Sequence, residues 1–154
     1  MDTASVTNIV RYKFYERSNY EPLVAAKVVK LIKESGIDEP IDYLNLKYAT
    51  VGFEDEKLIG IVMYGELEFI NETLPRFLHI IIAHEYRRTR KALKMLRISE
   101  KHLRNKGFKR VVTYIYHHLN NKEMRKKYAS KFGFKEYITT KEGDIMYKEL
   151  SGGK

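Results

Sequence analysis

Residues 80–97 read IIIAHEYRRTRKALKMLR, and this stretch decides the fold that the sequence predicts. The β-branched run Ile80–Ile82 is typical of a strand, the polar residues after it of a turn, and the apolar residues at helical spacing from Ala92 to Leu103 of a helix. The start of that helix is strongly basic, with Arg87, Arg88, Arg90 and Lys91. Because a helix N-terminus is already positive, each cation there costs about 0.3–1 kcal/mol. The stretch therefore predicts a bound anion such as a phosphate, unless the basic side chains simply extend into water.

The charge of the chain is unevenly distributed. The net charge is +9, but residues 1–75 carry 8 Lys and Arg against 13 Asp and Glu, whereas residues 76–154 carry 21 against 7. The first part therefore has a net charge of −5 and the second of +14. An anionic partner is expected for the second part. Either a phosphorylated cofactor or a nucleic acid presents the phosphates that Lys and Arg bind.

Length and composition indicate one domain. The 154 residues suffice for one core, which we expect in residues 1–150, with residues 151–154 as a flexible tail. No apolar run approaches the roughly 18 residues of a membrane span. The first residues lack the basic and apolar blocks of a signal peptide, and the chain has no cysteine. We therefore expect a cytoplasmic protein.

The hydrophobic pattern predicts strands interspersed with helices. Strands are expected at residues 8–16, 48–53, 58–69, 76–83, 109–116, 134–140 and 144–150, and helices at residues 22–34, from the basic stretch to 105, and 122–132. Residues 71–75 are expected to form a loop, and residues 37–47 are compatible with a second small helix. This order predicts an α/β fold of the α+β type, with one mixed sheet of about six to seven strands flanked by helices.

Two adjacent motifs lie at the start of the basic part of the chain. Residues 82–87 are similar to a V-x-P-x-x-R turn at the end of a strand, with His84 in the place of the proline. Residues 87–92 are similar to R/Q-x-x-G-x-G/A at the start of a helix, with Arg90 in the place of the first glycine.

Further along the chain, Asn121 and Tyr128 have the spacing N-(x)6-Y, and Gly133-Phe134 follows with one residue more than usual after Tyr128. Together these motifs resemble the signature of the GCN5-related N-acetyltransferases, which transfer an acyl group from acyl-CoA to an amine. The resemblance extends over roughly residues 8–150 in the order of elements.

The resemblance implies that acetyl-CoA is a co-substrate. In this family, backbone N–H groups of the turn hold the cofactor pyrophosphate at a helix N-terminus. The resemblance assigns cofactor binding to Ile82, Arg87, Arg88, Thr89, Arg90, Lys91, Ala92 and Asn121. The side chain of Arg90 could either crowd the pyrophosphate or pair with a phosphate of the same ligand.

Acylation of an amine needs a base for the amine and an acid for the leaving thiolate. His79 occupies a strand position where members of the family often carry Glu or His facing the acceptor amine, and imidazole suits the base role. Tyr128 corresponds to the family's acid, although counting back from Gly133 selects Ala129, about 100° further around a helix. The alternatives are that His79 and Tyr128 only pack or hydrogen-bond locally. Glu66 and Glu68, on one strand face, could act through water.

Two further functions stay open at this point. The basic residues of 87–110 and 122–132, with Tyr114 and Tyr116, could form a surface for nucleic acid. An acetyltransferase-like fold could also serve as a non-catalytic binding module or as part of a protein assembly. The histidines match no standard metal-site spacing, so no metal is expected. The acceptor amine and the oligomeric state are not predicted, although the acidic first part is compatible with a cationic acceptor.

Overall fold

The computed structural model describes residues 9–36, 46–69 and 71–150. Its strands are β1 (Val10–Glu16), β2 (Tyr48–Glu54), β3 (Lys57–Phe69), β4 (Glu72–Ile82), β5 (Arg110–Tyr116), β6 (Lys135–Thr139) and β7 (Gly143–Glu149). Its α-helices are α1 (Pro22–Glu34), α2 (Lys91–Asn105) and α3 (Lys122–Lys131), and short 3-10 helices are η2 (Arg17–Asn19) and η3 (His84–Tyr86). Most of residues 37–47, where a small helix was expected, and the expected tail at residues 151–154 lie outside the described residues.

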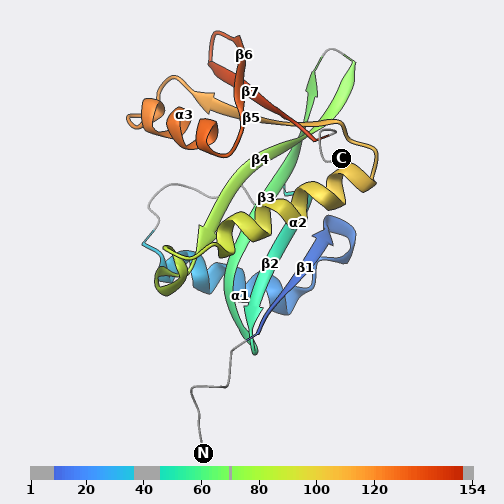
Figure 1. Cartoon of the computed structure of the whole chain (residues 1–154), viewed down its shortest axis with the longest axis vertical. Helices are drawn as coiled ribbons and strands as arrows, with labels where there is room; N and C mark the ends of the chain where they lie inside the picture. The colour runs from blue at the N-terminus through green and yellow to red at the C-terminus, as the bar shows by residue number, and fades with distance from the viewer. Residues whose placement is uncertain (1–8, 37–45, 70, 151–154) are drawn as a thin grey trace, which may run out of the picture. The chain divides into compact units, whose positions relative to one another are not determined.

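The seven strands form one mixed sheet in the order β1-β2-β3-β4-β5-β7-β6 (Figure 1). β1 pairs with β2, β5 with β7 and β6 with β7 in antiparallel fashion, whereas β4 and β5 are parallel. The recorded β4–β5 pairs are Arg76 with Val112 and Phe77 with Thr113. This mixed sheet with its helices confirms the predicted fold class.

The contacts divide the chain into two compact units. The first comprises the described residues up to Met63 together with His79–Ser99, and the second comprises Tyr64–Leu78 together with the described residues from Glu100 onward. β3, β4 and α2 each contribute residues to both units. The expectation of one domain over residues 1–150 stays a prediction.

The core of the first unit lies on both faces of its strands, with α1 on one face and α2 on the other (Figure 1). α1 buries Val24, Val28, Leu31 and Ile32. On the opposite face, a Cβ added at Gly60 of β3 would lie only 2.6 Å from Cε of Met95 on α2. Glycine at this position therefore lets α2 pack closely against β3. The helix is further fixed by Ser99, whose buried hydroxyl donates to the hydroxyl of Thr50 at 2.7 Å.

The core of the second unit is formed by aromatic and aliphatic side chains. The rings of Tyr64 and Phe77 lie 5.9 Å apart edge to face, and those of Phe77 and Phe134 lie 6.2 Å apart. Leu74, Val112 and Ile145 form a buried cluster in the same unit.

One expected boundary is wrong. Residues 71–75 were expected to form a loop, but β4 already begins at Glu72. The turn before it is tight because Asn71 adopts a φ of 61°, in the left-handed region that Asn tolerates. Leu74 is then buried, and its burial favours the extended strand over a loop. Pro75 is accommodated just before Arg76, where the recorded pairing with β5 starts.

Among the described helices, none has both the length and the apolar character that crossing a membrane requires.

Candidate functional site

Short-range hydrogen bonds shape the loop between β4 and α2. At its start the amide of Ala83 donates to the carbonyl of Ile59 on β3, with an N–O distance of 2.7 Å. The amide of Tyr86 then donates to the carbonyl of Ala83 at 2.9 Å, and the amide of Thr89 donates to the carbonyl of Tyr86 at 3.1 Å. The loop is therefore a compact turn that follows directly from the end of the strand.

Thr89 caps the N-terminus of α2. Its hydroxyl donates to the carbonyl of Tyr86 at 2.6 Å and accepts the amide of Lys91 at 3.3 Å. The carbonyl of Arg90 accepts the amide of Lys94 at 3.0 Å, which is the first bond of the helix. The helix thus begins at Lys91 because a side-chain hydroxyl satisfies a backbone donor at its start.

The basic residues consequently do not lie where the sequence placed them. Four cations were expected within the first turn of the helix, but Arg87, Arg88 and Arg90 precede it and only Lys91 belongs to that turn. Arg90 still lies directly at the positive end of the helix, whereas Arg87 and Arg88 lie further from it, so fewer cations oppose the helix dipole than expected. Most of the cations that favour an anion thus lie in the loop rather than in the helix.

The three arginines of the loop differ in what they contact. Nε of Arg87 donates to the carbonyl of Ile82 at 3.3 Å, which ties the loop back to the end of β4. Arg88 and Arg90 are exposed. In the part of the chain that the structure describes, neither their amides nor their guanidinium groups have an acceptor. These two residues therefore offer both backbone and side-chain donors at the start of α2.

Arg90 stands where the resembling motif has glycine, yet its backbone does not require glycine. Of the described residues, the non-glycine residues with positive φ are Asp55 and Asn71. Arg90 therefore keeps a negative φ, which any L-residue adopts without strain. An arginine at this position is therefore compatible with the conformation of the loop.

Two contacts that the sequence did not reveal hold this loop against the β2–β3 turn. The hydroxyl of Tyr86 donates a hydrogen bond to the carboxylate of Glu54. Lys57 forms an ion pair with Glu85, with an N–O distance of 2.9 Å. The hydrogen bond to Glu54, followed by burial, raises the pKa of Tyr86 to about 12. The charged turn was visible in the sequence, but its partners were not, because they lie far away along the chain.

The expected catalytic histidine lies in the same unit as the loop. His79 is half-buried on β4, and it has an interaction partner within the protein. The first unit thus contains His79 and every loop residue assigned to the cofactor, from Ile82 to Ala92. The role of His79 as a base stays a prediction.

Asn121 and Tyr128 lie in the second unit, on α3. Asn121 is the N-cap residue, but its side chain does not cap the helix, since its Oδ1 instead accepts Nε of Arg125 at 2.9 Å. Tyr128 is 55% exposed, and Nζ of Lys131 lies 5.7 Å from the centre of its ring. The phenol is therefore accessible from solvent. The assignments of both residues stay predictions.

The residues between Tyr128 and Gly133 complete α3 and its C-terminal turn. The helix runs to Lys131, and the amide of Phe132 donates to the carbonyls of both Tyr128 and Ala129. Gly133 then adopts a φ of 97°, and the amide of Phe134 returns to the carbonyl of Ala129 at 3.0 Å. The helix is therefore regular at Tyr128, and glycine is used to end it.

A search of the described residues finds no group of three or more His, Asp or Glu side chains that could hold a metal ion.

Comparison with protein families identifies the class of protein. The model of the acetyltransferase (GNAT) family matches residues 12–134. The chain therefore belongs to the GNAT acetyltransferase family, whose members are typically enzymes. A search of curated proteins gave no match.

Solved structures show the same fold at low sequence identity. A protein from Desulfovibrio desulfuricans that is described as an acetyltransferase of the GNAT family is 13% identical with a TM-score of 0.73, and the match covers 93% of this chain and 100% of that one. The PaiA N-acetyltransferase of Thermoplasma acidophilum, solved with coenzyme A, is 16% identical with a TM-score of 0.62 and coverage of 90% and 99%. The ribosomal-protein-S18-alanine N-acetyltransferase of Escherichia coli is 13% identical with a TM-score of 0.61 and coverage of 94% and 97%.

Proposed function

We propose that this protein transfers the acetyl group of acetyl-CoA to a primary amine by direct attack of the amine on the thioester. The observation that carries the proposal is the loop between β4 and α2. Its exposed Arg88 and Arg90 present donors that have no acceptor among the described residues. The family of the chain and the coenzyme A held by the related PaiA structure support acetyl-CoA as the anion.

In this proposal the loop residues divide into two groups. The amides of Arg88, Arg90 and Ala92 bind the pyrophosphate, because donors at a helix N-terminus are oriented towards an anion. The guanidinium groups of Arg88 and Arg90 and the ammonium of Lys91 add charge-assisted hydrogen bonds.

Arg87 and Thr89 act on the loop rather than on the ligand. Arg87 contacts the carbonyl of Ile82, and Thr89 caps α2. Both residues keep the loop amides oriented, and Ile82, the last residue of β4, would contribute to binding the ligand. Asn121 is proposed to contact acetyl-CoA from α3.

The chemistry then needs two proton transfers. His79 accepts a proton from the acceptor amine, whose nitrogen attacks the carbonyl carbon of the thioester and forms the C–N bond. The C–S bond breaks, and the leaving thiolate takes a proton from the phenol of Tyr128. The products are an acetylated amine and free coenzyme A.

Calorimetric titration with acetyl-CoA tests the proposal. The wild-type protein should bind acetyl-CoA, and Arg88→Ala should weaken binding about tenfold because a charge-assisted contact is lost. Arg97→Ala is the matched control, since Arg97 is an exposed cation two turns further along α2 and should leave the affinity unchanged. Absence of both heat and thermal stabilisation at millimolar acetyl-CoA would overturn the proposal.

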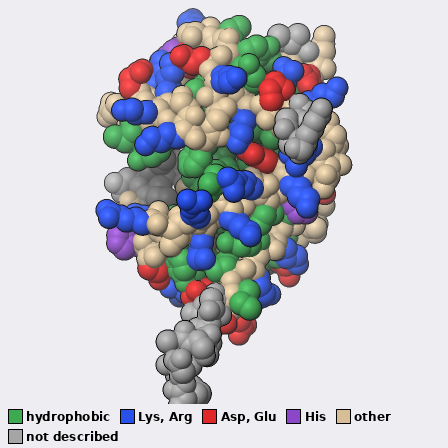
Figure 2. All heavy atoms as spheres, viewed as in Figure 1, with side chains coloured by type: hydrophobic (Ala, Val, Ile, Leu, Met, Phe, Trp, Pro, Cys, Tyr) green, Lys and Arg blue, Asp and Glu red, His purple; other side chains and the backbone are tan. Residues whose placement is uncertain are grey.

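A nucleic acid is the second candidate ligand, favoured by the cations beyond the loop. Lys94 and Arg97 are exposed on α2, and within the described residues neither has a carboxylate partner. Figure 2 shows Lys and Arg side chains at the surface over this helix. Binding to RNA or duplex DNA should then fall steeply with salt and should be weakened by Arg97→Ala. If neither RNA nor duplex DNA binds at low salt, a nucleic acid is excluded as the ligand. The same conclusion follows if Arg97→Ala does not change the affinity for nucleic acid.

A further inference from the structure

α3 is attached to its unit in an unusual way. None of its residues from Lys122 to Lys131 is buried, and its two largest hydrophobic side chains, Met124 and Tyr128, are 58% and 55% exposed. Most helices are held by an apolar face. Because α3 lacks one, another interaction has to fix its position.

The C-terminus of α3 is fixed by the residues that follow it. Gly133 ends the helix, and Phe134 behind it is buried and contacts Phe77. This anchor holds one end of the helix but does not determine its rotation about its own axis.

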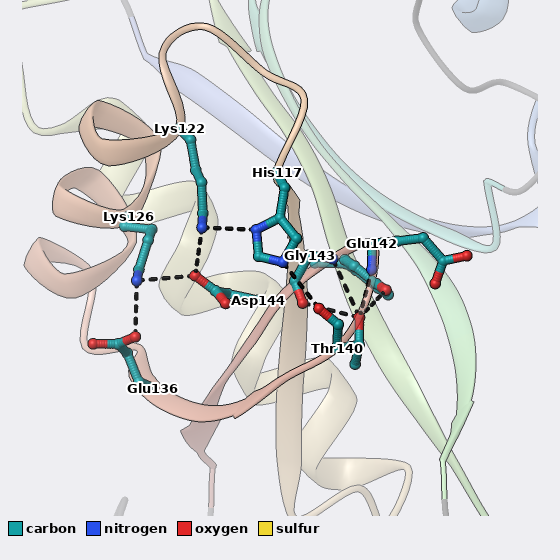
Figure 3. Close-up of polar contacts among 9 residues, drawn as sticks. His117, Lys122, Lys126, Glu136, Thr140, Glu142, Gly143 and Asp144 are labelled. Atoms are coloured by element: carbon teal, nitrogen blue, oxygen red, sulfur yellow. Dashed lines mark hydrogen bonds and ion pairs between the residues drawn. The ribbon is translucent and has the colours of Figure 1, made fainter.

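The N-terminal half is fixed by a buried carboxylate. Asp144, at the start of β7, has a side chain that is only 6% exposed. One of its oxygens, Oδ2, lies 3.0 Å from Nζ of Lys122 and 3.0 Å from Nζ of Lys126 (Figure 3). The two lysines are four residues apart and therefore share one face of the helix. A single carboxylate thus binds two successive turns of α3.

Neighbouring side chains complete this anchor. Nζ of Lys126 also lies 2.8 Å from Glu136 on β6. Nζ of Lys122 lies 2.8 Å from Nδ1 of His117, whose Nε2 is 2.9 Å from the carbonyl of Thr140. Since an ammonium only donates, Nδ1 accepts, and the ring is the neutral tautomer that donates through Nε2. Figure 3 shows these groups converging between α3 and the β6–β7 strands.

The electrostatics favour the charged forms of Asp144 and Lys126. Hydrogen bonding from Lys126 holds the pKa of Asp144 well below its usual range, against the opposing effect of burial. Hydrogen bonding to Glu136, and next to Asp144, raises the pKa of Lys126. A buried carboxylate without a cation nearby would instead strongly destabilise the folded state.

The rotation of α3 that this anchor fixes determines the direction in which Tyr128 faces. Tyr128 lies two positions after Lys126, which corresponds to about 200° around the helix axis. While the lysines face Asp144, Tyr128 consequently faces away from β7, on the exposed side of α3.

We infer that Asp144 is a positioning residue, which sets the rotation of α3, and with it the direction of the Tyr128 side chain, through Lys122 and Lys126. This inference rests on the proposed acetyl transfer. Asp144 itself touches neither substrate. It acts only through the two lysines of α3.

Amide hydrogen exchange tests the anchor without any ligand. Asp144→Asn should accelerate exchange across residues 122–131 by about tenfold or more, because the helix opens more often once the pair is lost. Glu100→Gln is the matched control, since it removes a partly buried pair with Lys148, at 2.8 Å, that lies outside α3. Unchanged protection of α3 in Asp144→Asn would overturn the inference.

A double-mutant cycle shows whether Asp144 acts through the lysines. In a protein carrying Lys122→Met and Lys126→Met, adding Asp144→Asn should not accelerate exchange in α3 further. Full additivity would mean that Asp144 acts elsewhere and would contradict the inference. Lys126→Met alone is a milder variant should Asp144→Asn fold poorly, and it should show the same local acceleration.

Kinetics separate positioning from a purely structural role. Asp144→Asn should lower kcat about tenfold with little change in KM for the acceptor, because a displaced acid affects the chemical step. Faster exchange in α3 with unchanged kcat would contradict the positioning role. Failure of the proposed function looks different, since the wild-type protein would then not bind acetyl-CoA at all while the exchange experiments still report on the anchor.

Discussion

The hydroxyl of Tyr86 donates a hydrogen bond to the carboxylate of Glu54, and this links the loop after β4 to the β2–β3 turn. The ion pair of Lys57 with Glu85 forms a second link between the same two segments. The loop proposed to bind the pyrophosphate is therefore held against the β2–β3 turn by a phenol hydrogen bond and by an exposed ion pair. Of these, the phenol is the more informative to alter, because it is partly buried and its ionisation can be followed.

Replacing Tyr86 by Phe should lower the free energy of unfolding by about 1 kcal/mol at neutral pH, through loss of one hydrogen bond. Because the folded-state pKa of Tyr86 is raised to about 12, its contribution is complete below the pKa of an unfolded tyrosine, about 10, and is lost as the pH rises through 12. Chemical denaturation across this range should show the difference between wild type and Tyr86→Phe shrinking. If the free energies of unfolding of the two proteins differ by the same amount at every pH, the hydrogen bond of Tyr86 is not the source of the difference.

Arg90→Gly should not restore a better site. Since Arg90 has a negative φ, glycine gains nothing in the folded state and costs about 0.5–1 kcal/mol of stability through the freedom of the unfolded chain. Its affinity for acetyl-CoA should fall by the same factor as that of Arg90→Ala, because both lose the guanidinium. Tighter binding by the glycine variant would show that the side chain obstructs the ligand.

His79→Ala should lower turnover by about 10²-fold or more and remove the pH step of the base from the profile of kcat/KM, as expected for loss of a general base. The measurement is the pH–rate profile of both proteins with the same amine. His84→Ala serves as the control, since His84 is an exposed histidine in the loop and should keep the pH step. A profile of His79→Ala that matches wild type would exclude the base role.

Tyr128→Phe should lower kcat without weakening the binding of acetyl-CoA, because the phenol acts on the leaving thiolate in the transition state. Tyr137→Phe is a suitable comparison, as Tyr137 is also exposed, at 45%, and lies on β6. Equal turnover of the two variants would leave the acid to another group.

The elements of the fold could be predicted because their signals are local. The apolar spacing within α1 and the alternation of the strands record burial directly, and the predicted helices and strands are found at those places. The start of α2 was misjudged although a signal existed, since the hydroxyl of a threonine can accept a backbone amide at the start of a helix, as Thr89 does for Lys91. The start of β4 was misjudged because Pro75 and Asn71 suggested a loop, while the burial of Leu74 is a tertiary effect.

The contacts that shape the candidate site were beyond the sequence for a different reason. Tyr86 contacts Glu54, and Asp144 contacts two lysines of α3, only after the chain has folded and brought these distant segments together. Nothing in the residue types distinguishes Asp144 from the other acidic residues. Asp144 pairs with the lysines because it is buried. The burial of a single polar residue does not appear in the hydrophobic pattern of the sequence.

The absence of buried side chains from α3 also determines how its detachment should respond to solvent. Denaturant sensitivity and heat-capacity change both scale with the surface that an opening newly exposes. The helix can separate from β7 while exposing little apolar surface, so this local opening should be nearly independent of urea and should change little in heat capacity. Salt, which screens charges, should promote it instead. The helix that carries Tyr128 is thus expected to respond to ionic strength under conditions in which the sheet stays folded.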